Sequence, residues 1–431
     1  MRASPISSPP RPLGAYLLQL LIAAALISIS CSLSTETSRR NFFHTASVAA
    51  TAGLSSQVIV PSLQAVSAPT AAGKSLICVT GANGYIGLHC VSQLLVAGYS
   101  VRAAVRSLSE DKTKWLTKVA TDAGAIDRLS FAIINLADVD SMADAVRGCD
   151  SLLHLASPFT IKAREDPTKT IVEPAVSGAC NAVIAAQKVG LRRVVSCGSV
   201  FGVAGSGSEQ GYDHVYNNRD VNGFSTLKGC SYAYSKKESQ EKSIALANEL
   251  GVDMVTLNVG QVCGPALSPD QMNPSWEPFK LLGNPPQGGA VLSACVPAMV
   301  DVRDAALAHV AALKLPPSSP ETTRRYIVAA QKSSPTYVEI AGLMAEILPE
   351  RKLQSNVDVL APTVQKLIVK GIGFGDKSLG ELIEGVSVPL GGATILMDVE
   401  PMIKDLVPEP RAIKTTLTDW VNNQLEYGHS I

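Results

Sequence analysis

The amino-acid sequence predicts an α/β fold: a Rossmann-type doubly wound parallel sheet with a smaller, interleaved C-terminal substrate lobe. Short apolar runs alternate with longer amphipathic segments from Lys74 onward, which is the pattern of parallel strands joined by crossover helices. The first apolar run leads into three glycines spaced three residues apart, Gly81, Gly84 and Gly87. The chain of 431 residues, 46% hydrophobic and 17% charged, is long enough for two lobes with sizeable cores.

Residues 1–72 are expected to be a targeting presequence and not part of the fold. The apolar run 13–29 is typical of a signal sequence, with an uncleaved membrane anchor as the alternative. The run 38–43 resembles a twin-arginine export motif, although an Arg- and Ser-rich transit peptide would share its composition. Two stacked signals are typical of multipartite plastid presequences. We therefore expect a plastid protein, thylakoid-directed if the second signal acts, with a secretory or anchored protein as the alternative.

The Rossmann-type domain is expected over residues 73–265. Its predicted strands are 75–80, 100–105, 129–134, 151–156, 193–197 and 252–259. Helices are predicted from the glycine turn to about residue 97 and at 113–121, 141–146, 168–188 and 231–250, with a polar, Gly-rich loop at 202–229. Ligands of such folds bind at the carboxyl ends of the strands.

The pattern changes after residue 265, and residues 266–431 are expected to form mainly a substrate-binding lobe. Pro-, Gly- and Ser-rich loops fill 266–298. A helix at 300–313 and a strand at 326–330 are expected to return to the first domain, so that 300–331 belongs to it. Further helices are predicted at 337–348, 363–372 and 415–424.

Charge and cysteine content argue against several kinds of partner. The 37 basic and 37 acidic residues balance, which gives no electrostatic reason to expect nucleic acid. Nine cysteines are scattered singly, without CxxC or Cys/His clusters, so neither a metal site nor a disulfide framework is expected. A membrane partner is expected only through the presequence, and the protein is expected to be a monomer or a homodimer.

The glycine turn is the candidate pyrophosphate site. Glycine allows a tight turn and close approach of a phosphate to backbone N–H groups, and the following helix adds the positive end of its dipole. The G-x-x-G-x-x-G spacing differs from the commonest dinucleotide fingerprint, and similar turns occur without a ligand. The candidate cofactor residues in this stretch are Gly81, Asn83, Gly84, Tyr85, Ile86 and Gly87.

The end of the second strand favours NADPH over NADH. An NAD site usually places a carboxylate there to bind the ribose 2′-hydroxyl, but none occurs before Glu110. Arg106 closes the strand, and Lys112 follows on the next helix. A guanidinium at this point suits a 2′-phosphate, whereas the alternative is a solvated basic start of the helix. Residues 73–265 are therefore expected to be an NADP-binding domain.

Tyr232 and Lys236 are the candidate proton-transfer pair. They are four residues apart on a predicted helix and therefore share a face. A nearby ammonium stabilises phenolate, so such a tyrosine can donate a proton to a carbonyl oxygen while hydride reaches the carbon. Ser199 follows the strand 193–197, where its hydroxyl could bind the substrate oxygen or could simply cap the strand end.

This combination resembles the extended short-chain dehydrogenase/reductases, and most closely the group of dihydroflavonol 4-reductase and cinnamoyl-CoA reductase. The motifs that carry the resemblance are 79–87, 101–106, 153–159, 232–236 and 300–309, within about residues 74–425. The resemblance implies catalytic roles for Ser199, Tyr232 and Lys236, with Lys236 also binding the nicotinamide ribose. The further cofactor residues that it implies are Arg106, Asn135 with Leu136 near the adenine, and the strand end Leu155, Ala156 and Ser157.

Some positions depart from the family pattern. Asn135 replaces an aspartate, Gly198 replaces the first of a serine pair, and Val259 replaces a proline. Cys230-Ser231 replaces the Asn-Trp that precedes the tyrosine of cinnamoyl-CoA reductases, which argues against a CoA-thioester reaction.

The predicted function is therefore an NADPH-dependent oxidoreductase that interconverts a ketone or aldehyde and an alcohol on a small organic substrate. One alternative is a nucleotide-sugar epimerase or a 3β-hydroxysteroid-type dehydrogenase on the same fold. An alternative of another class is a non-catalytic NADP-binding sensor or scaffold.

Overall fold

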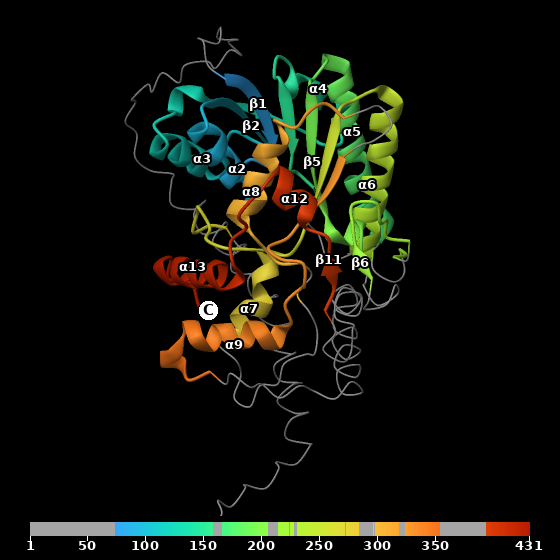
Figure 1. Ribbon diagram of the computed structural model, residues 1–431. Helices are drawn as coiled ribbons and strands as arrows, with labels where there is room; N and C mark the ends of the chain where they lie inside the picture. The colour runs from blue at the N-terminus through green and yellow to red at the C-terminus, as the bar shows by residue number, and fades with distance from the viewer. Residues whose placement is uncertain are drawn as a thin grey trace, which may run out of the picture. The chain divides into compact units, whose positions relative to one another are not determined.

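A seven-stranded sheet forms the centre of the protein (Figure 1). The structure, a computed structural model, describes residues 74–157, 166–205, 214–223, 225–227, 231–271, 273–283, 296, 298–318, 324–353 and 394–431. The presequence and the helix predicted at 363–372 lie outside these ranges. All strand pairs of the sheet are parallel, in the order β10-β7-β5-β4-β1-β2-β3. The order reverses direction between β1 and β4, which is the topological switch point where doubly wound folds bind their ligands.

The predicted fold class is confirmed. The strands are β1 (Lys74–Thr80), β2 (Tyr99–Val105), β3 (Leu129–Ile133), β4 (Ser151–His154), β5 (Arg193–Ser199), β7 (Met254–Val259) and β10 (Arg324–Val328). Most of their residues are buried, because helices cover both faces of a parallel sheet.

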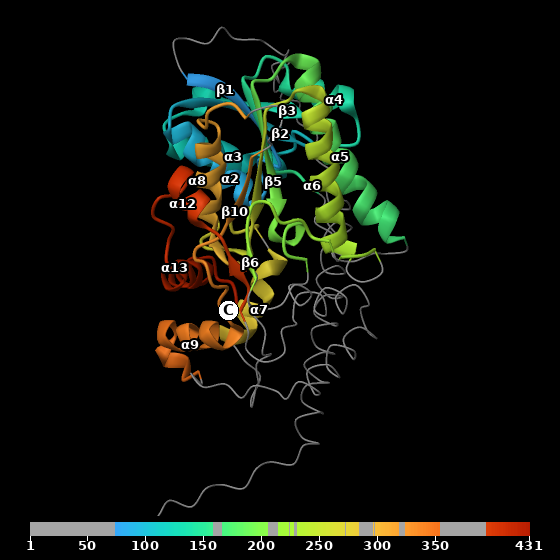
Figure 2. The same ribbon diagram turned by 45° about the vertical axis from the view of Figure 1, so that its right-hand side comes forward.

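The helices divide between the two faces of the sheet (Figure 2). One face carries α2 (Tyr85–Val96), α3 (Glu110–Asp122) and α8 (Val302–Ala312), and the other carries α4 (Val139–Val146), α5 (Glu173–Val189) and α6 (Ser231–Leu250). Alternation along β1 explains the two cores: Ile77 and Val79 pack in the first cluster, whereas Cys78 packs in the second.

Several boundaries differ from the predicted ones, and two of these differences have a clear local cause. The helix predicted from residue 168 begins with a π-helical turn, Thr168–Val172, and Pro174, which has no N–H to donate, follows at the start of α5. The helix predicted from residue 300 begins at Val302, because the Asp301 side chain caps it by accepting from Arg303 N. Val300–Asp301 instead form β9, which pairs with β8 (Val262–Cys263). β4 ends at His154, two residues before the predicted end.

The C-terminal part has its own aromatic core. Helices α7 (Glu277–Gly283), α9 (Tyr337–Ile347) and α13 (Ile413–Glu426) surround the buried Trp276, Phe279 and Trp420. β6 (Val215–Tyr216) pairs with β11 (Leu396–Met397), which α12 (Glu400–Asp405) follows. The division of the chain at residue 265 remains a prediction. Among the described residues, none of the helices combines the length and hydrophobicity that a membrane span requires.

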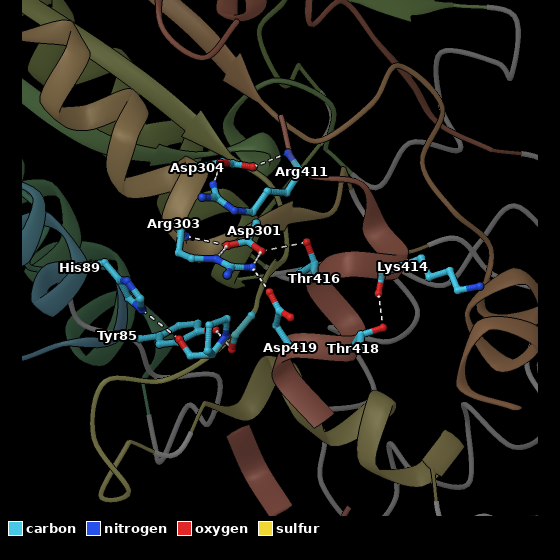
Figure 3. A network of polar contacts seen from close by, with 12 residues as sticks. Tyr85, His89, Asp301, Arg303, Asp304, Arg411, Lys414, Thr416, Thr418 and Asp419 are labelled. Atoms are coloured by element: carbon cyan, nitrogen blue, oxygen red, sulfur yellow. Dashed lines mark hydrogen bonds and ion pairs between the residues drawn. The ribbon is translucent and has the colours of Figure 1, made fainter. Parts of the chain in front are cut away.

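A polar network joins α8 to α13 (Figure 3). The fully buried Asp301 carboxylate accepts from the Arg303 guanidinium at 2.9 and 2.7 Å and from Thr416 Oγ1 at 2.9 Å. Arg303 also pairs with Asp419 at 2.7 Å. The network therefore connects the C-terminal helix to the helix that packs against α2.

Candidate dinucleotide and catalytic site

The glycine turn has the geometry of a phosphate site. Gly81 adopts φ +66°, and Gly84 N donates to its carbonyl at 2.9 Å. A Cβ at Gly87 would lie 2.1 Å from Gly81 O, so the first turn of α2 packs against the loop as only glycine permits. The N-terminus of α2 has no side-chain cap, which leaves backbone N–H groups for an anion.

Two of the predicted cofactor residues use their side chains elsewhere. Tyr85 Oη donates to Gly264 O at 2.6 Å, and burial raises the pKa of its phenol well above the ordinary value. Ile86 packs against the main core. One turn further along α2, His89 Nε2 donates to Pro265 O at 2.9 Å (Figure 3). Tyr85 and Ile86 therefore present only their backbone to the predicted phosphate site.

Residues 264–271 cross from α2 to α3, a contact that sequence reasoning missed. Gln271 Nε2 donates to Gly84 O at 3.1 Å, inside the glycine turn. Asp270 accepts from Trp115 Nε1 at 2.7 Å on α3. Gln271 Oε1 is buried and has no hydrogen-bond partner in the described part of the chain.

Arg106 directly follows the last residue of β2 and is exposed. Within the described ranges its guanidinium makes no hydrogen bond or ion pair, whereas Lys112 pairs with Asp111 at 2.7 Å. Hydrogen bonding to Lys112 lowers the pKa of Asp111. Arg106 is therefore the more available cation at the strand end, as a 2′-phosphate site requires.

Asn135 and Leu136 shape the turn from β3 into α4. Asn135 Oδ1 accepts from Ala137 N at 3.1 Å, and Asn181 Nδ2 on α5 donates to Leu136 O at 2.9 Å. The turn lies at the carboxyl end of β3, so both residues stay at the sheet edge where a dinucleotide is expected.

The end of β4 meets the predicted catalytic lysine. Ala156 N donates to Thr80 Oγ1 at 3.2 Å, and Ala156 also borders Gly81, which sets the strand end beside the glycine turn. Lys236 Nζ donates to Ser157 Oγ at 3.0 Å. Leu155, the remaining predicted residue here, packs against the main core.

Lys236 and Tyr232 lie together, as their spacing predicts. Lys236 Nζ is 5.2 Å from the centroid of the Tyr232 ring, which is within the range of a cation–π contact. Burial lowers the pKa of Lys236 because it disfavours the charged form. Hydrogen bonds from the ammonium to nearby polar groups offset this effect. Phe201 packs edge-on against Tyr232 with ring centroids 5.9 Å apart.

Ser199 is the last residue of β5. Its Oγ accepts from Phe201 N at 3.3 Å and so caps the short 3₁₀ turn Val200–Gly202. The backbone N–H thus bonds the serine oxygen, and the ring of the same Phe201 contacts Tyr232. The structure brings Ser199, Tyr232 and Lys236 to one edge of the sheet, next to the end of β4.

Comparisons with known proteins show the family and the fold of the chain. A family model described as "NAD dependent epimerase/dehydratase family" matches residues 77–328. Cinnamoyl-CoA reductase 1 of Arabidopsis thaliana is 34% identical over 293 residues, covering 65% of this chain and 77% of that protein. Dihydroflavonol 4-reductase of Zea mays is 35% identical over 205 residues, covering 46% of this chain and 56% of that protein.

Solved structures share the fold. Vestitone reductase from alfalfa has a TM-score of 0.62 at 22% identity, covering 82% of this chain and 99% of that one. Yeast methylglyoxal/isovaleraldehyde reductase Gre2, solved with NADPH, has a TM-score of 0.64 at 23% identity, covering 83% of this chain and 100% of that one.

The chain belongs to the NAD dependent epimerase/dehydratase family. Within it, the protein is an NAD(P)-dependent oxidoreductase of the extended short-chain dehydrogenase/reductase type, and the predicted resemblance to the cinnamoyl-CoA and dihydroflavonol reductases is confirmed.

Proposed function

We propose that the protein uses NADPH to reduce a ketone or aldehyde on a small organic molecule to an alcohol, and that the same groups serve the reverse oxidation. The observation that carries the proposal is the position of the half-buried Lys236. Its ammonium bonds Ser157 Oγ at the end of β4 and faces the Tyr232 ring on α6. Pure dinucleotide binding does not require a tyrosine at this point, which disfavours a non-catalytic sensor.

The residues present fit NADPH. The uncapped N-terminus of α2 and the glycine turn would hold the pyrophosphate, and Arg106 would hold the 2′-phosphate. When bound, NADPH supplies the hydride. Gre2, which shares the fold, was solved with this cofactor.

Three side chains would bind the substrate oxygen or transfer its proton. Ser199 Oγ would donate a hydrogen bond to the carbonyl oxygen and orient it. The Tyr232 phenol would give that oxygen its proton as hydride adds to the carbon, leaving an alcohol and a phenolate. Lys236 would stabilise the phenolate through its positive charge.

We further propose a substrate of the dihydroflavonol-reductase kind rather than a CoA thioester. Several relatives are cinnamoyl-CoA reductases, but this chain has Cys230-Ser231 before the tyrosine, in place of their Asn-Trp. The test is NADPH oxidation by the purified protein against flavanonols, aldehydes, small ketones and a cinnamoyl thioester. Turnover of a ketone or aldehyde is expected, and turnover of the thioester alone would contradict the substrate assignment.

A plastid location is proposed from residues 1–72, with a thylakoid destination if the twin-arginine signal acts. Fluorescent protein fused after residue 72 should enter plastids, and accumulation along the secretory pathway would overturn this part of the proposal.

A further inference from the structure

A small polar chamber lies behind Lys236, between the sheet and helices α5 and α6. Lys236, His154, Ser196 and Thr256 are among its lining residues. His154 pairs in register with Ser196 on β5, and Ser196 pairs with Thr256 on β7. Residues in register on parallel strands present their side chains on one face. This polar row is unusual, because a parallel sheet covered on both faces is normally apolar.

Several polar atoms around the chamber have no hydrogen-bond partner among the residues that the structure describes. Thr256 Oγ1, Gln240 Oε1 and both amide atoms of Asn258 are buried and form no hydrogen bond with any described residue. Thr256 and Asn258 are two apart on β7 and share its inner face, and Gln240 lines the chamber from α6. Buried polar groups are normally satisfied, and a polar cavity that offers several such atoms normally holds ordered water.

Gly198 keeps this space open. It pairs in register with Asn258, and a Cβ there would lie 2.7 Å from Asn258 Oδ1 and 3.3 Å from Gln240 Oε1. Gly198 is one of the positions at which the sequence departs from the family it resembles. The departure therefore has a structural consequence, since a serine side chain would occupy the space that the two amides border.

We propose that the chamber binds water that hydrogen-bonds the Lys236 ammonium, which makes Thr256 and Gln240 positioning residues acting through that water. Lys236 has three N–H donors, and Ser157 Oγ accepts one of them. The water would accept another and would itself donate to Thr256 Oγ1 or Gln240 Oε1. The positioning role rests on the proposed function, whereas the water site does not.

The other titratable groups facing the chamber do not change charge near neutral pH. They are His154 from β4 and Cys197 from β5. Burial lowers the pKa of His154 to about 4 and raises that of Cys197 to about 11. Cys197 still titrates in the alkaline range, so a change in the alkaline limb of the pH profile is assigned by comparing the variants at Thr256.

Thr256→Val tests the positioning role, because valine keeps the shape of threonine and removes the hydroxyl. In the full-length protein we expect kcat to fall about fivefold, the worth of one ordinary hydrogen bond, with the Kd for NADPH unchanged. The less stabilised ammonium supports phenolate less well, so the alkaline limb of the reduction profile should move to higher pH. Thr256→Ser, which restores the hydroxyl, should restore the profile. Equal profiles for the Val and Ser variants, or a Val variant like wild type, would overturn the role.

A crystal structure of the wild-type protein tests the water site directly, whatever the variants do. Water within hydrogen-bond distance of Thr256 Oγ1 and Lys236 Nζ is expected, and an empty chamber would overturn the inference. If the crystal structure shows this water but the protein reduces no carbonyl, the proposed function and the positioning role are both overturned. The water site itself would still be confirmed.

Discussion

Asp301 is the residue on which the attachment of α13 to α8 depends (Figure 3). Its buried carboxylate caps α8, pairs with the Arg303 guanidinium and accepts from Thr416 Oγ1. A helix N-cap contributes about 1 kcal/mol, and removing one partner of a buried ion pair costs about 3–5 kcal/mol. The two contributions come from the same carboxylate, so they do not simply add. Arg303 also keeps Asp419 as a partner when Asp301 is removed, which reduces the loss. We therefore expect Asp301→Ala to lower the free energy of unfolding by about 3 kcal/mol.

Denaturant unfolding with Asp419→Ala as the matched control measures this difference. Asp419 binds the same guanidinium but is 37% exposed, so its loss should cost at most about 1 kcal/mol. Equal destabilisation by the two variants, or a loss below about 1 kcal/mol for Asp301→Ala, would refute the reasoning.

The same residue predicts a pH dependence. Burial raises the pKa of Asp301, but the hydrogen bonds from Arg303 lower it by more. The pKa of Asp301 in the folded protein therefore lies below the ordinary value. Stability from such a group is present above the pKa of the unfolded chain and is lost as pH falls through that of the folded protein. The difference between wild type and Asp301→Ala should therefore shrink below about pH 4, and a constant difference would contradict the shift.

Two further predictions concern the cofactor site. Gly87→Ala places a Cβ 2.1 Å from Gly81 O, so the Kd for NADPH should rise at least about tenfold in a fluorescence titration. Gly223→Ala, where a Cβ meets nothing within 4 Å, should leave the Kd unchanged, and similar Kd values for the two variants would count against the phosphate site. Arg106→Ala should weaken NADPH at least about tenfold without affecting NADH. Equal losses for both cofactors would show that the guanidinium does not bind the 2′-phosphate.

Features set by local sequence could be predicted. Apolar runs define the strands of the sheet, and the spacing of Tyr232 and Lys236 places both on one face of α6 because a helix repeats every 3.6 residues. Gly81 and Gly87 were recognisable because few residues other than glycine fit such a turn. Two-residue strands such as β8 and β9 are too short to show a periodic pattern, and the sequence did not predict them.

Features set by tertiary contact could not be predicted. The composition of 264–271 indicates only a loop, and its contacts with Gly84 and Trp115 depend on how α2 and α3 pack. Ser157 and Lys236 are 79 residues apart, and nothing local indicates that they bond. Likewise, Thr256 looks ordinary within its apolar strand, and only the register with Ser196 shows a polar row.

In the proposed reaction the Tyr232 phenol protonates the substrate oxygen. Tyr232→Phe keeps the ring that packs against Phe201 and Lys236 and removes only the hydroxyl. With any carbonyl substrate found in the panel, single-turnover NADPH oxidation should slow at least about 100-fold, while the Kd for NADPH stays at the wild-type value. Wild-type turnover by this variant would contradict the mechanism.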